Sequence, residues 1–235
     1  MGRVRYLHLG TEWVQGSMLL DKPFDIELEY VQRMMAWLLF TEPGSVSRRH
    51  AMQLGLGAAS LTKFCYKKLR MKTTAIELNA QVIAACRIWF KLPADDARLS
   101  VIVGDAAEVA AHEHWRGAID ALQVDLYDQQ AAAPVLDSQE FYADCRKLLS
   151  EDGCMTVNLF GRSSSYAASL QKIVAAFGAG AVWAFRPTRE GNTIVLALRA
   201  PQRPDRMVLA ERAETIQTRW GLPARKWLRV FKPVQ

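Results

Sequence analysis

The sequence HAMQLGLGAAS at residues 50–60 reads as a short apolar strand that runs into Gly55-x-Gly57 and then into a helix. Glycines at such a turn let the backbone bend sharply, and a ligand can approach without meeting a Cβ atom. The first N–H groups of the following helix have no intrahelical partner, so they can face the polar end of that ligand. We therefore expect Gly55 and Gly57 to form a nucleoside-binding loop, although the same pattern also occurs in purely structural turns.

Strand and helix patterns alternate on the C-terminal side of this loop. The alternation predicts an α/β, Rossmann-like fold with a mostly parallel sheet and helices on both faces. The last two of seven expected strands have no helix between them, so we expect them to form an antiparallel end pair. Such a sheet is typical of S-adenosylmethionine-dependent methyltransferases. Strands are expected near residues 50–54, 73–78, 99–103, 119–125, 155–159, 182–185 and 193–198, and helices near 60–69, 80–90, 106–111, 138–149 and 165–177.

The chain divides into three expected parts. Residues 1–22 contain two short extended runs and predict a small β-hairpin. Residues 23–200 form the Rossmann-like domain, which begins with a helix whose apolar positions lie between residues 26 and 39. Residues 201–235 are a basic extension, and the nine basic and three acidic residues of 199–235 account for the whole net charge of +6. We interpret this extension as a solvated tail or a docking segment, and we do not expect nucleic-acid binding because no recognition motif accompanies it.

Composition and cysteine spacing indicate the cellular compartment in which we expect the protein. The first ten residues lack an apolar core, so we do not expect a signal peptide. No apolar run approaches the roughly 20 residues of a membrane helix. Four irregularly spaced cysteines carry no zinc signature, and the histidines are scattered, so we expect reduced core thiols and no metal site. These patterns favour a cytoplasmic globular protein that does not bind a membrane.

Acidic residues follow the second and third expected strands. Glu77 ends the second strand, 20 residues after Gly57, where a carboxylate can accept the protons of both ribose hydroxyls. Asp105 follows the third strand in the run Gly104-Asp105-Ala106. Its carboxylate could accept a proton from an adenine amino group, or it could cap the helix that begins there. We expect both positions to contact the nucleoside.

Two further acids, Asp125 and Asp128, stand at the end of the fourth strand, with Tyr127 between them. Ligands of open α/β sheets bind in the crevice at the carboxyl ends of the strands. Two carboxylates there would hold a cationic amine, and one could take the proton that an amine loses before it attacks carbon. The alternative is a strand-end acid and a turn acid without a function. Tyr127 is expected to pack on the substrate.

With these residues, the chain resembles the polyamine aminopropyltransferases, the spermidine synthase family, over roughly residues 13–198. The family's glycine-rich loop matches residues 55–59, its ribose motif matches residues 75–78, and its Asp-x-x-Asp motif matches residues 125–128. The resemblance implies a donor, decarboxylated S-adenosylmethionine, and a small diamine acceptor. It implies that Asp125 is the base, and that Asp128, Tyr127 and Gln32 bind the acceptor. It assigns to the donor Gly55, Gly57, Glu77, Leu78, Gly104, Asp105 and Ala106.

The chain departs from the family pattern mainly on the acceptor side. Ala58 stands where the family's loop usually carries an aspartate. The family's Tyr-His-Glu segment reads Tyr30-Val31-Gln32, and Gln129 replaces the proline that usually follows the Asp-x-x-Asp motif. The N-terminal β domain of the family is reduced to a short remnant. Because two pocket acids are missing, the field that would attract a dication is weaker.

Other functions remain open from the sequence alone. A methyltransferase that uses ordinary S-adenosylmethionine is the first alternative, because Ala58 would not repel the donor's carboxylate. A non-catalytic nucleoside-binding or scaffold protein is the second. A nicotinamide-dependent dehydrogenase fits less well, since Ser60 replaces the third glycine of that fingerprint. We expect a homodimer formed through residues 1–40, where a short β remnant leaves exposed strand edges.

Overall fold

The structure, a computed structural model, describes residues 3–8, 10, 14–126, 136–160 and 163–234. Its main sheet has eight strands in the order β10-β8-β9-β7-β6-β3-β4-β5. The five strands from β5 to β7 in this order are parallel, and β9, β8 and β10 are each antiparallel to the preceding strand. The strands are β3 (His50–Leu54), β4 (Lys72–Glu77), β5 (Leu99–Val103), β6 (Ile119–Val124), β7 (Leu149–Phe160), β8 (Val182–Phe185), β9 (Asn192–Leu198) and β10 (Phe231–Pro233).

This sheet confirms the predicted Rossmann-like fold with its antiparallel end pair. Strands β3 and β9 are buried along their whole length, as expected of apolar runs covered on both faces. The number of strands differs from the prediction, because β10 adds an eighth strand beside β8. Its residues Phe231–Pro233 lie in the basic extension, where no alternating pattern predicted a strand.

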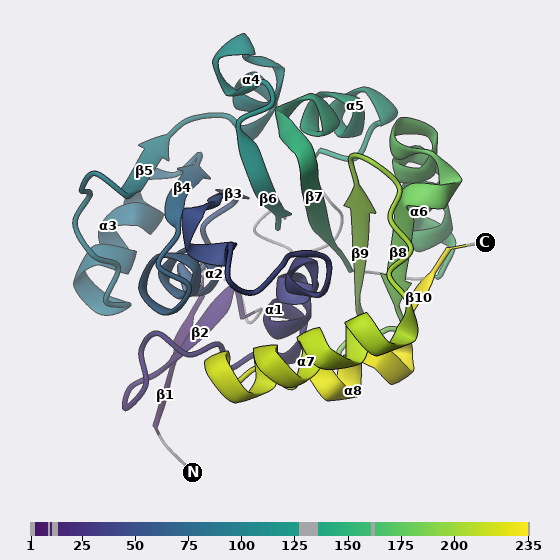
Figure 1. The fold of residues 1–235 in the computed structure, drawn as a ribbon. Helices are drawn as coiled ribbons and strands as arrows, with labels where there is room; N and C mark the ends of the chain where they lie inside the picture. The colour runs from purple at the N-terminus through teal and green to yellow at the C-terminus, as the bar shows by residue number, and fades with distance from the viewer. Residues whose placement is uncertain (1–2, 9, 11–13, 127–135, 161–162, 235) are drawn as a thin grey trace.

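Helices cover both faces of the sheet (Figure 1). Helices α4, α5 and α6 lie on one face, and α1, α2, α7 and α8 lie on the other. None of the described helices combines the length and apolar character that crossing a bilayer requires. All four cysteines are buried and free. The α-helices are α1 (Glu29–Arg33), α2 (Ser60–Lys63), α3 (Ala80–Trp89), α4 (Ala106–Ala111), α5 (Gln139–Leu148), α6 (Ser163–Phe177), α7 (Arg206–Trp220) and α8 (Ala224–Val230), and the other helical segments are η1 (Met34–Phe40), η2 (Val46–Arg48), η3 (Phe64–Lys68), η4 (Glu113–Trp115) and η5 (Ala179–Ala181).

The helix expected between residues 26 and 39 is shorter and less regular than predicted. Helix α1 begins at Glu29, and the chain continues from Met34 as the 3-10 helix η1. All seven residues of η1 are apolar and buried. This segment has no polar face, so it lies inside the core and packs against β7, β9 and α7.

The basic C-terminal extension is not a solvated tail. Helix α7 buries Ala213, Ile216 and Trp220, whose spacing of three and four residues places them on one face. Arg212 donates a hydrogen bond from Nη1 to the carbonyl oxygen of Leu39 in η1, at 2.9 Å. The extension therefore folds onto the domain and completes its core and its sheet.

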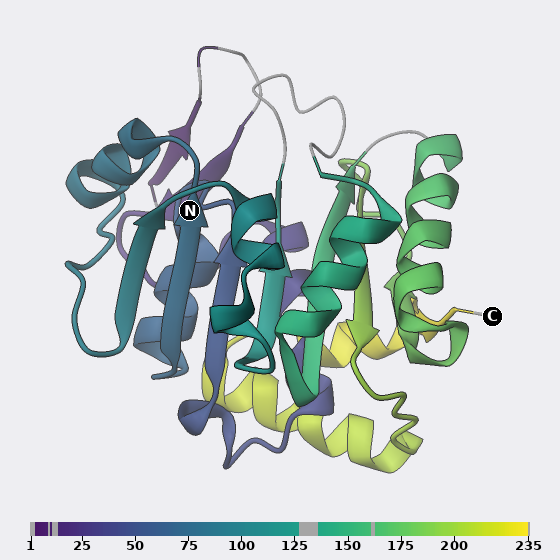
Figure 2. The ribbon, with the colours of Figure 1, turned by 90° about the horizontal axis from the view of Figure 1, so that it is seen from above.

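A small hairpin precedes the main domain, as predicted. Strands β1 (Val4–Leu7) and β2 (Gly16–Leu19) pair antiparallel. The hydroxyl of Ser60 at the start of α2 donates to the carbonyl oxygen of Ser17 in β2, at 2.9 Å. The hairpin lies near the carboxyl ends of the parallel strands, while α7 lies toward their amino ends (Figure 2).

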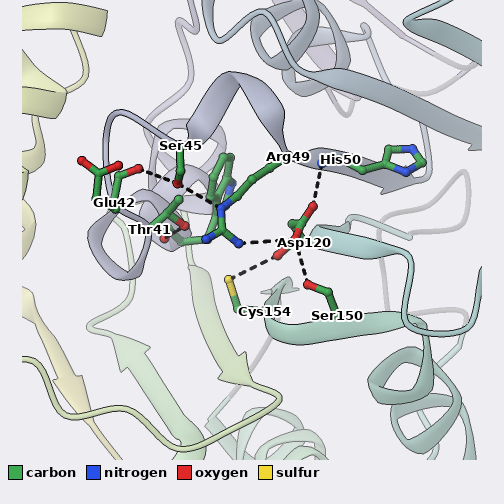
Figure 3. Close-up of polar contacts among 9 residues, drawn as sticks. Thr41, Glu42, Ser45, Arg49, His50, Asp120, Ser150 and Cys154 are labelled. Carbon is green, nitrogen blue, oxygen red and sulfur yellow. Dashed lines mark hydrogen bonds and ion pairs between the residues drawn. The ribbon is translucent and has the colours of Figure 1, made fainter.

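A polar network joins three strands where they begin (Figure 3). Asp120 of β6 accepts hydrogen bonds from the backbone N–H of His50 in β3 at 2.8 Å and from the hydroxyl of Ser150 in β7 at 2.8 Å. The guanidinium of Arg49 lies 3.3 Å from the same carboxylate. One half-buried carboxylate thus satisfies donors from adjacent strands and fixes their relative positions.

His50 makes the stability of the fold dependent on pH. Burial, with a smaller contribution from Lys72, lowers the pKa of His50 from 6.5 to about 4. The unfolded chain therefore binds a proton between these values that the folded chain does not, and stability is lost as the pH falls from 6.5 toward 4. We expect the free energy of unfolding to decrease by about 2–3 kcal/mol more in wild type than in His50→Gln between pH 7 and pH 4.5.

Urea unfolding at the two pH values measures this difference. Titration of the carboxylates is common to both proteins and cancels in the comparison. His8→Gln changes an exposed histidine and is the matched control. Parallel pH profiles for wild type and His50→Gln would contradict the assignment.

Candidate active site

The predicted nucleoside loop connects β3 to α2 and lies against two neighbouring segments. Gly55 has a φ of +85°, and a Cβ atom there would overlap the carbonyl oxygen of Asp125. Gly57 has a φ of +52°, and a Cβ atom there would lie 2.9 Å from the carbonyl oxygen of Gln15. Both positions therefore need glycine for conformation and for space. The loop forms a close-fitting cradle between the end of β6 and the N-terminal hairpin.

Glu77 lies at the end of β4, beside this loop. One carboxylate oxygen accepts a hydrogen bond from the backbone N–H of Leu56 at 2.9 Å, and the other accepts one from Asn79 at 2.9 Å. Each oxygen keeps further acceptor capacity, so the same carboxylate can still receive two hydroxyl protons. Leu78 follows with its side chain 72% exposed. The arrangement fits a ribose at this position.

Asp105 lies next to Glu77, after the adjacent strand β5. The backbone N–H of Gly104 donates to the carbonyl oxygen of Glu77 at 3.0 Å, which links the two strand ends. Asp105 accepts a hydrogen bond from the N–H of Ala107 at 2.7 Å and caps α4, whose first residue Ala106 is buried. The capping role is thus present in the structure. The adenine contact of Asp105 stays a prediction.

Asp125 follows β6, and its half-buried carboxylate is held between two side chains from distant segments. Asn158 of β7 donates from Nδ2 to one oxygen at 2.9 Å, and the hydroxyl of Tyr30 donates to the other at 3.4 Å. Burial raises the pKa of Asp125, and the two hydrogen bonds partly oppose that rise. A carboxylate with a raised pKa is a stronger base, which suits proton transfer.

The hydrogen bonds continue from Asp125 across the sheet. Asn158 accepts a hydrogen bond from Nδ2 of Asn192 in β9 at 3.1 Å, and the backbone N–H of Asn192 donates to the hydroxyl of Thr188 at 3.2 Å. Both asparagines are buried. Side chains from α1, β7 and β9 therefore set the orientation of one carboxylate.

Sequence reasoning did not assign roles to Tyr30 or Asn158. Tyr30 stands at the tyrosine of the segment that resembles the family's Tyr-His-Glu, and this match is a usable signal. Asn158 is the one strongly polar side chain in the apolar run MTVNLF at residues 155–160, and this isolation is a usable signal. A buried polar group needs a partner, so such a residue points to a contact within the fold.

The structure describes only some of the residues that were predicted to bind the acceptor. The Nε2 of Gln32 donates to the carbonyl oxygen of Ile26 at 2.8 Å, so this amide also has a local structural role. Val31 is buried. Ala58 is also buried, and a Cβ atom at Gly16 would lie 2.6 Å from its own Cβ. Tyr127, Asp128 and Gln129 lie outside the described residues, and their expected roles stay predictions.

The comparisons with known proteins agree with this geometry. Residues 57–195 match the spermine/spermidine synthase domain family. The polyamine aminopropyltransferase of Chromobacterium violaceum is 32% identical over 223 residues, which cover 94% of this chain and 83% of that protein. The fold is that of a Rossmann-like α/β domain. The chain belongs to the spermine/spermidine synthase family.

Solved structures show how widely this fold is shared. A probable spermidine synthase from Corynebacterium glutamicum has a TM-score of 0.74 at 19% identity and covers 98% of this chain and 87% of its own. Human methyltransferase-like protein 13, in complex with SAH, also has a TM-score of 0.74, at 21% identity, and covers 83% of this chain and 93% of its own. Fold similarity alone therefore does not distinguish aminopropyl transfer from methyl transfer.

We expect Glu77→Gln to weaken binding of methylthioadenosine roughly 10- to 100-fold, because a charged acceptor is worth about 1.5–3 kcal/mol. The amide also turns one acceptor into an N–H donor that faces the N–H of Leu56 or Asn79. Isothermal titration measures the affinity. Glu151→Gln, an exposed glutamate at the other end of the sheet, is the control. If Glu77→Gln bound methylthioadenosine as tightly as wild type, Glu77 would not be the ribose ligand.

We expect Asn158→Leu to move the acidic limb of the pH–rate profile to higher pH. Loss of the amide donor removes a hydrogen bond that lowers the pKa of Asp125, so more of that carboxyl is protonated at a given pH. Thr156→Val is the matched control, because Thr156 is a buried polar residue of the same strand that bonds Met34 instead. The Thr156→Val variant should be less stable, but the acidic limb of its pH–rate profile should not move. An unmoved limb in Asn158→Leu would show that Asn158 is only structural.

Proposed function

We propose that this protein transfers an aminopropyl group from decarboxylated S-adenosylmethionine to a small amine. The observation that carries the proposal is the position of Asp125. Its half-buried carboxylate adjoins the nucleoside loop at Gly55, in a chain 32% identical to a polyamine aminopropyltransferase over 94% of its length. The assignment of each site residue below is part of this proposal.

The residues of the donor side fit a nucleoside. Gly55 and Gly57 carry no Cβ atom, so the loop packs closely between Asp125 and Gln15 and its backbone would contact the ligand directly. Glu77 would bind the ribose hydroxyls, and Asp105 would bind the adenine amino group, with Leu78, Gly104 and Ala106 beside them. The donor itself supplies a sulfonium that activates the neighbouring methylene carbon. The protein would mainly hold the two reactants in line.

Asp125 would accept the proton of the attacking amine. An amine is protonated at neutral pH and must lose a proton before its lone pair can form a bond to carbon. Tyr30 and Asn158 hold the carboxylate in one orientation, so it is preorganised for this transfer. Asp128, Tyr127 and Gln32 are proposed to contact the acceptor. Because Val31 and Gln32 replace a histidine and a glutamate of the family's amine pocket, we infer an acceptor that differs from the family's ordinary diamine.

Methyl transfer from ordinary S-adenosylmethionine is the second candidate. The supporting observation is Ala58, which is buried against Gly16 and brings no negative charge to the loop. An aspartate at this position would repel the carboxylate that distinguishes the ordinary donor from the decarboxylated one. A non-catalytic nucleoside-binding protein would share the donor side and lack turnover.

A donor comparison separates these functions. Titration calorimetry gives the affinities for decarboxylated S-adenosylmethionine, S-adenosylmethionine and methylthioadenosine, and mass spectrometry follows the products with a panel of mono-, di- and polyamines. The proposal predicts release of methylthioadenosine and an amine heavier by one aminopropyl group. Tighter binding of the carboxylated donor with transfer of a methyl group would establish the second candidate. Binding without turnover of any amine would indicate a non-catalytic protein.

We also propose a cytoplasmic homodimer. The free, buried cysteines suit a reducing compartment. The N-terminal sheet has two strands, and Tyr6 on it is 50% exposed. A second copy would cover these strand edges. Sedimentation of the intact chain and of a Tyr6→Lys variant tests the assembly, since a dimer that uses this surface should dissociate.

A further inference from the structure

A hollow of about 500 Å³ opens where the parallel strands begin. We call it the amino-end pocket. Its walls include Lys68 and Arg70, which precede β4, and Arg98, which precedes β5. Arg219 and Trp220 come from the end of α7. Asp125 follows the carboxyl end of β6, so this pocket and the candidate active site lie at opposite ends of the sheet.

The positive charge of the amino-end pocket is only partly neutralised. Four of its lining side chains are cations, and no carboxylate lines it. Asp25 lies outside the lining and pairs with Lys68 at 2.7 Å. Within the described part of the chain, Arg70 has no hydrogen-bond or ion-pair partner. Asp96 attracts Arg98 as Asp25 attracts Lys68, so the least compensated cations of the pocket are Arg70 and Arg219. Neighbouring cations repel one another, and a bound anion would relieve that repulsion.

Two of the arginines are held in place by aromatic rings. The guanidinium of Arg98 lies 4.6 Å from the ring centroid of Tyr66, and that of Arg219 lies 5.1 Å from Trp220. Arg219 also donates to the carbonyl oxygen of Pro43 at 3.4 Å. Side chains that are already ordered lose less conformational entropy when they bind a ligand. The four cations are exposed at the mouth of the pocket, and the two rings limit the motion of Arg98 and Arg219.

The backbone conformation of Arg70 fixes where this side chain leaves the chain. Arg70 has a φ of +60°, in the left-handed region that residues with a Cβ atom rarely adopt. Such conformations cost free energy and persist where the surrounding structure imposes them. Here the bend between η3 and β4 turns the chain at Arg70, a residue that lines the pocket.

We propose that the amino-end pocket binds a small anion that carries more than one phosphate group. Arginine is suited to this chemistry, because its planar guanidinium forms paired hydrogen bonds with phosphate oxygens. The volume falls within the range of small-molecule sites, which favours a metabolite over a nucleic-acid strand. The pocket also gives a role to Arg219, which belongs to the basic extension that catalysis does not use.

Titration calorimetry on the full chain, at fixed ionic strength, tests the pocket with inorganic pyrophosphate, ATP and citrate as probes. We expect saturable 1:1 binding of pyrophosphate or ATP that weakens at higher salt. The double variant Arg70→Gln and Arg219→Gln should weaken it at least about 10-fold, as expected for two lost charged contacts. The double variant Lys226→Gln and Arg229→Gln removes the same charge from exposed positions on α8 and should change it less than about 2-fold.

The outcomes separate a built site from general attraction. Equal weakening by the two double variants, or no saturable binding, would overturn the proposal. Citrate binding as tightly as pyrophosphate would show that phosphate is not recognised. Tighter binding of a short single-stranded RNA would point to a nucleic-acid surface instead. Methylthioadenosine affinity should be unchanged in all variants, so the result is independent of the proposed transferase function.

Discussion

Asp125→Asn is expected to lower the turnover of aminopropyl transfer by about 10²–10⁴-fold, which is the usual contribution of a general base. The amide has nearly the shape of the carboxylate, but it cannot accept a proton at neutral pH. The attacking amine would then have to lose its proton to water. Affinity for methylthioadenosine should change little, because the nucleoside contacts assigned to Gly55, Glu77 and Asp105 remain.

Single-turnover kinetics measures the rate of aminopropyl transfer, and calorimetry measures the affinity for methylthioadenosine. Asp152→Asn makes the same chemical change at an exposed aspartate of β7 and should leave turnover unchanged. A mutant that keeps more than about one tenth of the wild-type rate would exclude Asp125 as the base. Loss of nucleoside binding in parallel with the rate would indicate a structural role instead.

Gly55→Ala is expected to be the most damaging single change to the loop. A residue with a Cβ atom at positive φ costs about 1–2 kcal/mol. At Gly55 the new atom would also overlap the carbonyl oxygen of Asp125, so the loop and the end of β6 would have to separate. We expect a total loss of about 3 kcal/mol or more in the free energy of unfolding, and loss of measurable methylthioadenosine binding.

Gly117→Ala is the matched control, because Gly117 has a φ of +68° and an added Cβ atom there meets nothing within 4 Å. Urea unfolding of this variant measures the conformational cost alone. The difference between the two variants measures the overlap with Asp125. Equal stability losses would mean that the loop can move away from β6 without cost.

Much of this fold is predictable because local patterns and turn residues agree. The expected strands at residues 50–54, 99–103 and 182–185 coincide with β3, β5 and β8. Strand β7 begins at Leu149 rather than Met155, because its first half includes the polar, exposed residues Glu151 and Asp152, which conceal the pattern. The C-terminal extension was misinterpreted because its many charges hid the apolar face of α7.

The candidate site also has residues that the sequence predicts and residues that it does not. Strand-end acids such as Glu77 and Asp125 can be found from the sequence, because parallel strands end at one edge of a sheet. The support of Asp125 cannot be found so simply. Tyr30 and Asn158 lie 95 and 33 residues from it in the chain, and only the packing of α1 and β7 brings them to its two oxygens.

The tight contact between Gly16 and Ala58 ties the N-terminal hairpin to the nucleoside loop. A Cβ atom at Gly16 would lie 2.6 Å from the Cβ atom of Ala58, which is buried. The hairpin can therefore rest directly on the loop only while position 16 carries no side chain. A substitution at Gly16 is for this reason a change to the loop as well as to the hairpin.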